Sequence, residues 1–154
     1  MTSRVRLVQR HSHNLLLVHA VWATARRECV LEPSADPWLT DILRRKAYEA
    51  GSALLACGNA DDHVHVVVRY PSSVTWASVV QRLKGASSYE WNLARRSPRL
   101  RWQAGSWCES VSPSDLAAVA RYVQTQRTHH RETAAAEPWE SVHSPSSCEE
   151  IGAR

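Results

Sequence analysis

Two histidines, His63 and His65, are the residues of this chain best suited to bind a metal ion. They lie in the segment 61–70, DDHVHVVVRY, whose valines predict a β-strand. Side chains alternate between the two faces of a strand, so both imidazoles are expected on the same face. Such a pair can bind a divalent metal ion. The alternative is a half-buried strand with two incidental histidines, and the pair alone does not decide between them.

A second element, near residue 122, supplies groups that favour the metal site. Tyr122 and Gln126 are four residues apart in a predicted helix and therefore share one of its faces. The two imidazoles and the amide oxygen of Gln126 would hold a divalent ion and leave positions open for a substrate. A nitrogen and oxygen set without thiolate suits Mg²⁺ or Mn²⁺. The alternative is that Tyr122 is a half-buried helix residue and that Gln126 faces solvent.

The phenol of Tyr122 would lie close to a phosphate bound at that metal. A tyrosine has a pKa of about 10 and is a weak nucleophile while protonated, but a neighbouring cation could lower that pKa and stabilise the developing charge. Attack on a DNA phosphate would give a phosphotyrosyl enzyme and a free hydroxyl on the other strand end. Because the adduct keeps the bond energy, the strand could be rejoined elsewhere without ATP. We therefore interpret Tyr122 as a catalytic nucleophile.

The composition favours one domain with an anionic partner. A chain of 154 residues is typical of a single domain with a substantial core. The formal charge of +4, with Arg far outnumbering Lys, points weakly to nucleic acid. The four cysteines lie far apart and form no CxxC pair, which predicts a reduced, cytoplasmic chain. No apolar run has the length of a membrane span, and no signal-peptide pattern opens the chain.

The predicted elements follow the order strand, helix, strand, strand, helix, strand, helix. We expect the helices at 38–50, 74–93 and 113–130, and strands at 15–24, at 52–57, around His63 and His65, and at 102–111. The turn 58–62 should join two of these strands in an antiparallel hairpin. This order predicts an α+β fold, an antiparallel sheet with helices packed on it, close to a ferredoxin-like plan. The expected divisions are a basic arm at 1–14, a catalytic domain at 15–132 and a weakly ordered tail at 133–154.

Basic side chains near aromatic ones are the candidate DNA contacts. Arginines crowd a loop around Pro98, with Trp91, Trp102 and Trp107 close to it in sequence. Arginine with aromatic residues suits single-stranded nucleic acid, although buried tryptophans beside a solvated loop would give the same pattern. Gly85 within a helix suggests either the close approach of a ligand or backbone, or a tolerated packing glycine. The candidate DNA-binding residues are Arg26, Arg27, Lys84, Ser87, Ser88, Arg95, Arg96, Arg99 and Arg101.

Several motifs in order give the chain a family resemblance over residues 15–132. They are VHAVWAT at 18–24, DHVH at 62–65, LKGASS at 83–88, WQAG at 102–105, SVS at 110–112 and YVQTQ at 122–126, which runs into HHR at 129–131. With these motifs the chain resembles the single-tyrosine HUH transposases of the insertion-sequence 200/605 type. The resemblance implies the HUH endonuclease fold, metal ligands at His63, His65 and Gln126, and a nucleophile at Tyr122.

The resemblance also implies an activity and partners. Such an enzyme is a homodimer that cleaves and rejoins single-stranded DNA at hairpin-marked element ends through a 5′-phosphotyrosine intermediate. Its nucleophile helix can dock on the partner subunit, which would make the active sites composite. A cytoplasmic, nucleoid-associated location is expected. The alternatives are a domesticated, repeat-associated tyrosine nuclease, a non-catalytic module that binds hairpin DNA, and a small regulatory domain whose histidines bind a transition metal.

Overall fold

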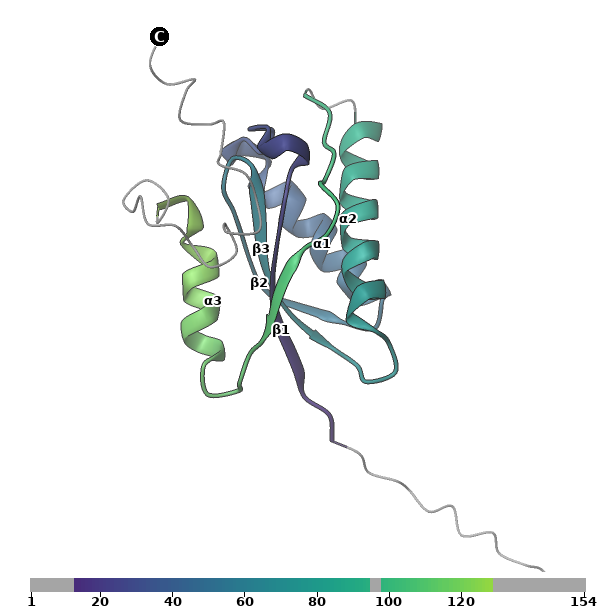
Figure 1. Ribbon diagram of the computed structural model, residues 1–154, viewed down its shortest axis with the longest axis vertical. Coiled ribbons are helices and arrows are strands. Elements are labelled where there is room, and N and C mark those ends of the chain that lie inside the picture. Colours follow the sequence, from purple (N-terminus) through teal and green to yellow (C-terminus); the bar gives the residue numbers. More distant parts are fainter. Residues whose placement is uncertain (1–12, 95–97, 129–154) are drawn as a thin grey trace, which may run out of the picture.

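The computed structural model describes residues 13–94 and 98–128 (Figure 1). The predicted basic arm up to residue 12, Arg95 and Arg96, and the predicted tail lie outside these residues. Within them the chain forms a four-stranded antiparallel sheet with packed helices, so the predicted α+β class is confirmed. None of the helices in these two segments is long and apolar enough to cross a membrane.

The sheet has the strand order of a ferredoxin-like fold. Its neighbours follow the order β2-β3-β1-β4, and every neighbouring pair is antiparallel. The helix α3 follows this βαββαβ unit. The elements are β1 (Leu16–Ala23), two short 3-10 turns (Ala25–Arg27 and Pro33–Ala35), α1 (Asp36–Glu49), β2 (Ala53–Asn59), β3 (His63–Tyr70), α2 (Trp76–Leu93), β4 (Trp107–Ser110) and α3 (Leu116–Gln124).

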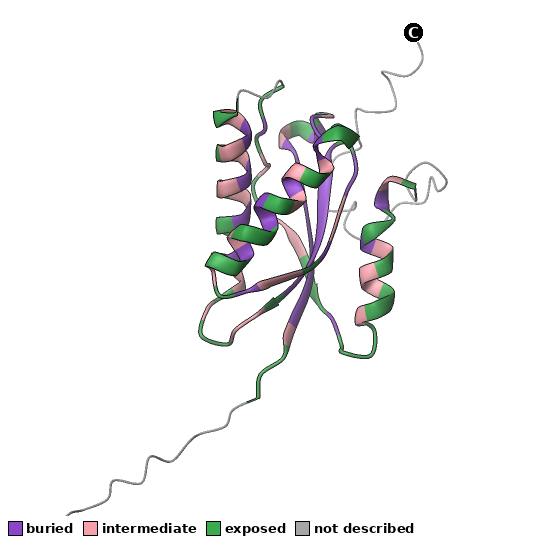
Figure 2. Ribbon diagram, turned by 180° about the vertical axis from the view of Figure 1, so that it is seen from behind, coloured by how far each residue is buried: buried purple, intermediate pink, exposed green. Residues whose placement is uncertain are grey.

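Different helices cover the two faces of the sheet (Figure 1). On one face, α1 and α2 pack on the main core, and most residues of the central strands are buried (Figure 2). The strand residues of this core include Val18, Ala20, Trp22, Val64, Val66 and Val68. On the other face, Ala56 and Val67 pack against Val123 of α3. Because strand residues alternate in direction, the histidines of β3 project toward the face that α3 covers.

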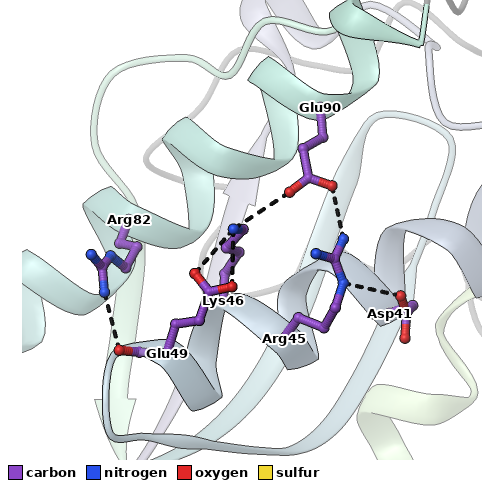
Figure 3. A network of polar contacts seen from close by, with 6 residues as sticks. All are labelled: Asp41, Arg45, Lys46, Glu49, Arg82 and Glu90. Atoms are coloured by element: carbon purple, nitrogen blue, oxygen red, sulfur yellow. Dashed lines mark hydrogen bonds and ion pairs between the residues drawn. The ribbon is translucent and has the colours of Figure 1, made fainter.

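Charged side chains join α1 to α2 on the solvent side of the main core (Figure 3). Glu90 of α2 accepts a hydrogen bond from Arg45 of α1 at 2.8 Å and lies 3.6 Å from the ammonium group of Lys46. Arg82 donates to the backbone carbonyl of Glu49 at 3.2 Å. Ion pairs in contact with water contribute little to stability, so the apolar contacts beneath them hold the two helices together.

The final strand is shorter than predicted. Regular pairing with β1 is confined to Trp107–Ser110, whereas Trp102 forms an isolated bridge with Thr24. Gly105 lies between the two, with a φ of +80° that side chains rarely allow. The segment therefore leaves the ladder at Gly105 and runs beside α2 before β4 begins.

The last helix is also shorter than predicted. It begins at Leu116, after Asp115 as N-cap, and its regular part ends at Gln124. The side chain of Thr125 then donates to the backbone carbonyl of Arg121 at 3.1 Å. The backbone N–H of Thr125 also donates to the carbonyls of Arg121 and Tyr122, at 3.2 and 3.3 Å. A hydroxyl that bonds the carbonyl four residues back often bends a helix. A further helical turn covers residues 126–128, and the predicted end at 129–130 lies outside the described residues.

One cysteine departs from the prediction of a reduced chain. Cys29 is disulfide-bonded. Cys57 and Cys108 carry free thiols. Distance along the chain does not limit which cysteines meet in a fold, so their wide spacing was a poor argument against a disulfide.

Candidate active site

The α3 side of the sheet collects histidines from two strands. In the ladder between β1 and β3, Val21 pairs with His65. In the ladder between β1 and β4, His19 pairs with Glu109. Because His19 is two residues from Val21 and His63 is two residues from His65, all these side chains share one face. The register therefore adds a third histidine and a carboxylate to the predicted pair.

His63 is fixed by a buried acidic neighbour. The Nδ1 atom of His63 donates to Oδ1 of Asp62 at 2.7 Å, and Nε of Arg27 forms an ion pair with Oδ2 of Asp62 at 2.7 Å. All three residues are buried. Arg27 has a φ of +58°, a conformation that costs a non-glycine residue about 1 kcal/mol or more. The proton on Nδ1 makes Nε2 the nitrogen of His63 that can bind a metal.

His65 is held through the same ring atom by a different partner. Its Nδ1 lies 3.1 Å from Nε2 of His19, so one ring donates a hydrogen bond to the other. The two rings stack with centroids 5.3 Å apart. On its other edge, Nδ1 of His19 lies 3.6 Å from Oε1 of Glu109. That distance exceeds a hydrogen bond, so this contact is electrostatic.

Tyr122 of α3 packs its ring against these histidines. Its ring centroid lies 5.8 Å from that of His65 and 6.0 Å from that of His19, both in edge-to-face geometry. Tyr122 is half-buried. The structure thus brings the predicted nucleophile and one predicted metal ligand side by side, although they lie 57 positions apart in the sequence.

A glycine in β2 permits this close approach. The strand extends through Asn59, so Gly58 belongs to the strand and not to the predicted turn, and it pairs with His65. A Cβ atom at Gly58 would lie only 1.6 Å from the carbonyl oxygen of Val123. Any larger residue would therefore push away the helix that carries Tyr122.

Gln126 lies in the interior with one unused hydrogen-bonding atom. It is fully buried, and its Nε2 donates to the backbone carbonyl of Tyr122 at 3.1 Å. Its Oε1 has no hydrogen-bond partner among residues 13–94 and 98–128. A buried acceptor left in this state costs about 1–3 kcal/mol. A cation bound at this oxygen would offset that cost, so the amide fits the ligand role predicted for it.

Arg127 ties the turn after α3 to the rest of the fold. Its guanidinium donates two bonds of 2.6 Å to Asp36, and it also binds Asp61 and a backbone carbonyl. Burial lowers the pKa of Arg127, but the hydrogen bonds and charges of the two aspartates outweigh burial and leave that pKa raised. Gln126 directly precedes Arg127, and Asp61 lies just before the first residue of β3, His63. The contacts of Arg127 therefore hold the turn with Gln126 near the start of β3.

The predicted ligands suit a divalent cation only if the side-chain amide of Gln126 is counted with the two histidines. No group of three or more His, Cys, Asp and Glu side chains in the described part of the chain could hold a metal ion. The predicted ligands, two imidazoles that are each engaged at Nδ1 and the buried Oε1 of Gln126, are the nitrogen and oxygen donors that divalent ions prefer. Three protein ligands would leave positions for a substrate oxygen.

Some of the candidate DNA contacts gather at a groove on the opposite side of the sheet. The groove has a volume of about 650 Å³, and its lining from α2 and residues 99–106 includes Lys84, Ser88, Arg99 and Arg101. The ammonium group of Lys84 donates to the backbone carbonyls of Gln103, at 2.7 Å, and Gly105. Burial lowers the pKa of Lys84.

The other candidate DNA contacts lie elsewhere. Arg26 is exposed and donates to Glu28 at 2.6 Å. Arg27 belongs to the buried ion pair with Asp62, and Ser87 is buried where it accepts a bond from Trp102 Nε1 at 2.9 Å. Burial does not suit a direct contact with phosphate at these two positions. Arg95 and Arg96 lie outside the described residues.

Sequence reasoning gave no role to several residues that build the site. His19 alternates with core residues in a correctly predicted strand, so the sheet face on which its side chain lies could have been assigned. Its contacts with His65 and Glu109 could not, because they depend on how the strands pair. The position of Glu109 opposite His19 is known only once the pairing of β4 with β1 is known. Gly58 had a signal, since glycine inside a strand indicates close backbone approach, but it was assigned to the turn.

The fold and site define a ferredoxin-like α+β protein with paired strand histidines and a helix-borne tyrosine on one face. The chain matches the family described as Transposase IS200 like over residues 12–126 and belongs to that family. It is similar to the crystal structure of a protein of Deinococcus radiodurans R1 that carries a provisional transposase assignment. That match has 27% identity and a TM-score of 0.61, and it covers 77% of this chain and 95% of the other.

A second solved structure shares the fold at lower identity. It is described as a REP-associated tyrosine transposase bound to a REP hairpin. The match has 14% identity and a TM-score of 0.59, and it covers 84% of this chain and 74% of the other. No match is found among the curated proteins. The predicted family is thus confirmed by the family match and the structural likeness.

Proposed function

We propose that this chain is a metal-dependent transposase that cleaves and rejoins single-stranded DNA, with Tyr122 as the nucleophile. The observation that carries the proposal is the packing of Tyr122 against His65, with ring centroids 5.8 Å apart. The likeness of the chain to a transposase family gives the reaction class. The buried, unused oxygen of Gln126 supports the metal.

The proposed reaction forms one bond at phosphorus and breaks another. The phenolic oxygen of Tyr122 gives its proton to water and attacks a DNA phosphate, and the bond from phosphorus to the 3′ oxygen breaks. The 3′ oxygen leaves and takes up a proton, which gives a 5′-phosphotyrosine and a free 3′ hydroxyl. A later 3′ hydroxyl attacks the adduct and releases Tyr122, so no ATP is consumed.

His63, His65 and Gln126 would hold the metal ion, Mg²⁺ or Mn²⁺. Such an ion, when bound, withdraws charge from the phosphate oxygens and so favours attack at phosphorus. The protein contributes ligands in fixed positions, because both histidines are engaged at Nδ1 and Gln126 is anchored through Tyr122. It also partly shields Tyr122 from water by packing it between α3 and the sheet.

Single-stranded DNA with hairpins is the proposed substrate class. A transposase with the same fold is described as bound to a REP hairpin. In this chain, Arg99 and Arg101 line the groove beside α2, where they could bind phosphates. The REP-associated relative also keeps the domesticated, repeat-associated nuclease as a second candidate, because that role would use the same chemistry.

We propose that the site is assembled within one chain, in place of the composite site implied by the resemblance. The helix α3 docks on the sheet of its own chain, against the notch at Gly58, and Arg127 binds Asp36 and Asp61. Only residues 111–115 join β4 to α3, and Val111 donates to the carbonyl of Leu17. A homodimer that exchanges α3 stays a prediction from the resemblance.

A mixing experiment separates the two arrangements. Tyr122→Phe keeps the metal ligands, and His65→Ala keeps the nucleophile. In composite dimers the mixture would regain part of the activity, since one site per dimer would be intact. Assembly within one chain predicts that the mixture stays inactive at every ratio, after dissociation and reassociation of the subunits.

An adduct assay tests the proposed reaction. The protein is incubated with labelled hairpin-bearing single-stranded DNA and Mg²⁺ or Mn²⁺, and the products are separated under denaturing conditions. We expect a covalent band that EDTA abolishes and that Tyr122→Phe lacks. Tyr89→Phe is the matched control, because Tyr89 is 67% exposed on α2. DNA binding without an adduct across a broad panel of hairpins would support a non-catalytic module and contradict the proposal.

A further inference from the structure

We propose that His19 is a positioning residue that fixes the tautomer of His65, and that Glu109 supports it from the neighbouring strand. The inference rests on the proposed function in one respect, since it takes His65 as a metal ligand. In the proposed arrangement, Nδ1–H of His65 donates to Nε2 of His19, and Nδ1–H of His19 points toward the carboxylate of Glu109.

The distances support this order of donors. Nδ1 of His65 and Nε2 of His19 lie 3.1 Å apart, and Nδ1 of His19 lies 3.6 Å from Oε1 of Glu109. A neutral imidazole carries one proton, so one of its nitrogens donates and the other accepts. The negative charge of Glu109 favours the tautomer of His19 with the proton on Nδ1. Nε2 of His19 then accepts, and His65 must donate through Nδ1.

The consequence falls on the other nitrogen of His65. With its proton on Nδ1, the ring presents the Nε2 lone pair, which is the form that binds a metal. The reverse direction of the bond would place the proton on Nε2 and block that atom. The arrangement matches His63, whose Nδ1 must donate because the carboxylate of Asp62 can only accept. Both rings would therefore offer the same atom.

Sheet register explains why these groups meet. His19 is directly opposite Glu109 in the ladder between β1 and β4. It also lies two residues along β1 from Val21, which pairs with His65 in the ladder between β1 and β3. His19 is 4% exposed, whereas Glu109 remains largely in contact with water. Trp107 meets the ring of His19 edge-on with centroids 5.3 Å apart, which limits its rotation. A buried imidazole that lies between a carboxylate and a ligand histidine can fix the tautomer of that histidine, which simple packing would not do.

The direct test reads the ring tautomer by nitrogen NMR in metal-free protein, at a pH of about 8 where an unperturbed histidine is neutral. We expect His65 with its proton on Nδ1 in the wild type. His19→Leu removes the acceptor and should shift His65 toward the other tautomer, while His63 stays unchanged because Asp62 holds it. A wild-type His65 with its proton on Nε2, or no change in His19→Leu, would overturn the inference.

Titration with Mn²⁺ alone, followed by electron paramagnetic resonance, gives a second measurement that does not depend on activity. Loss of an outer ligand partner typically weakens metal binding about 10–100-fold, and we expect this for His19→Leu. His19→Gln, whose amide oxygen can still accept from His65, should bind Mn²⁺ within a few-fold of wild type. Equal losses in the Leu and Gln variants would indicate simple packing and contradict the inference.

Two further variants separate the inference from the proposed function. Glu109→Gln lies at a largely exposed position, so we expect it to keep the fold and to give His19 a mixed tautomer. An unchanged tautomer of His19 would show that Glu109 does not orient it. His63→Ala should abolish Mn²⁺ binding. If it does not, the metal site of the proposed function fails, while the tautomer of His65 still decides the role of His19. If His19→Leu does not fold, the wild-type tautomer and Glu109→Gln decide.

Discussion

Gly58 of β2 lies directly against the backbone of Val123 in α3, where a Cβ atom would come within 1.6 Å of the Val123 carbonyl oxygen. Gly58 also pairs with His65 in the sheet. One glycine thus sets the separation between the strand that carries the histidines and the helix that carries Tyr122. The distance between Tyr122 and His65 depends on the absence of a side chain at this position.

The substitution Gly58→Ala should displace α3 and separate Tyr122 from His65. A displacement of about 1 Å at a reacting group can cost about 100-fold in rate, and we expect a loss of this order in adduct formation. Forced overpacking should also lower the free energy of unfolding by about 1–3 kcal/mol.

Gly85→Ala is the control for stability. A Cβ at Gly85 meets nothing within 4 Å, so this change should stabilise α2 by about 0.5–1 kcal/mol. Normal adduct formation by Gly58→Ala would show that α3 does not need its observed position.

The substitution Arg127→Ala should release the turn that carries Gln126. The substitution removes both hydrogen bonds from Arg127 to the carboxylate of Asp36. Hydrogen bonds to charged groups each contribute about 1.5–3 kcal/mol to the free energy of unfolding. We expect a loss of about 2–3 kcal/mol in urea unfolding and weaker Mn²⁺ binding. Arg45→Ala, which removes an exposed pair with Glu90, should change neither. Unchanged Mn²⁺ affinity in Arg127→Ala would argue against Gln126 as a ligand.

The double substitution Arg99→Ala and Arg101→Ala should weaken single-stranded DNA binding through lost phosphate contacts. Each contact to single-stranded DNA contributes about 0.7 to the slope of log affinity against log salt, so the slope should fall in magnitude by about 1.4. Arg82→Ala is the matched control, because Arg82 binds the carbonyl of Glu49 in the contact between α1 and α2. A slope equal to that of wild type would exclude the groove as the DNA path.

The two free thiols should differ in reactivity. Burial raises the pKa of Cys57 to about 12, whereas Cys108 is exposed. At a pH of about 8, iodoacetamide should therefore modify Cys108 and spare Cys57 until the chain is unfolded, as read by mass spectrometry of digested protein. Similar rates at both thiols in folded protein would contradict the raised pKa.

The same shift predicts a dependence of stability on alkaline pH. The pKa of Cys57 is higher in the folded chain than its ordinary value of 9.0, so the folded chain keeps this proton longer than the unfolded chain. Its contribution is complete at neutral pH and is lost as the pH rises from 9.0 toward about 12. Cys57→Ser should reduce this loss in urea unfolding measured across that range. An unchanged pH profile in Cys57→Ser would mean that other groups control alkaline stability.

The sequence predicted the strand–helix order because the signals are local. Valine runs and helical periodicity identify β1, β3, α1 and α2. The start of β4 was wrong because it depends on contacts from elsewhere in the fold. Lys84 binds the carbonyls of Gln103 and Gly105, which holds that segment out of the ladder.

The metal ligands and the nucleophile were proposed from residue type and spacing, which do not reveal distances between elements. The structure brings Tyr122 beside His65, but the roles of both residues stay predictions. The partners of the histidines could not be predicted, because His19 and Glu109 meet only through the register of two ladders. Arg27 was interpreted as a candidate phosphate contact at the end of the first strand, whereas here it is buried with Asp62.

The most direct test of the central claim is to locate the covalent bond to DNA. Trypsin cleaves after Arg121 and Arg127 and releases the peptide YVQTQR, which contains Tyr122 and no other tyrosine. After the cleavage reaction and nuclease digestion, mass spectrometry should find a nucleotide phosphate on this peptide, dependent on Mg²⁺ or Mn²⁺. A nucleotide found instead on the peptides that contain Tyr48, Tyr70 or Tyr89 would contradict Tyr122 as the nucleophile.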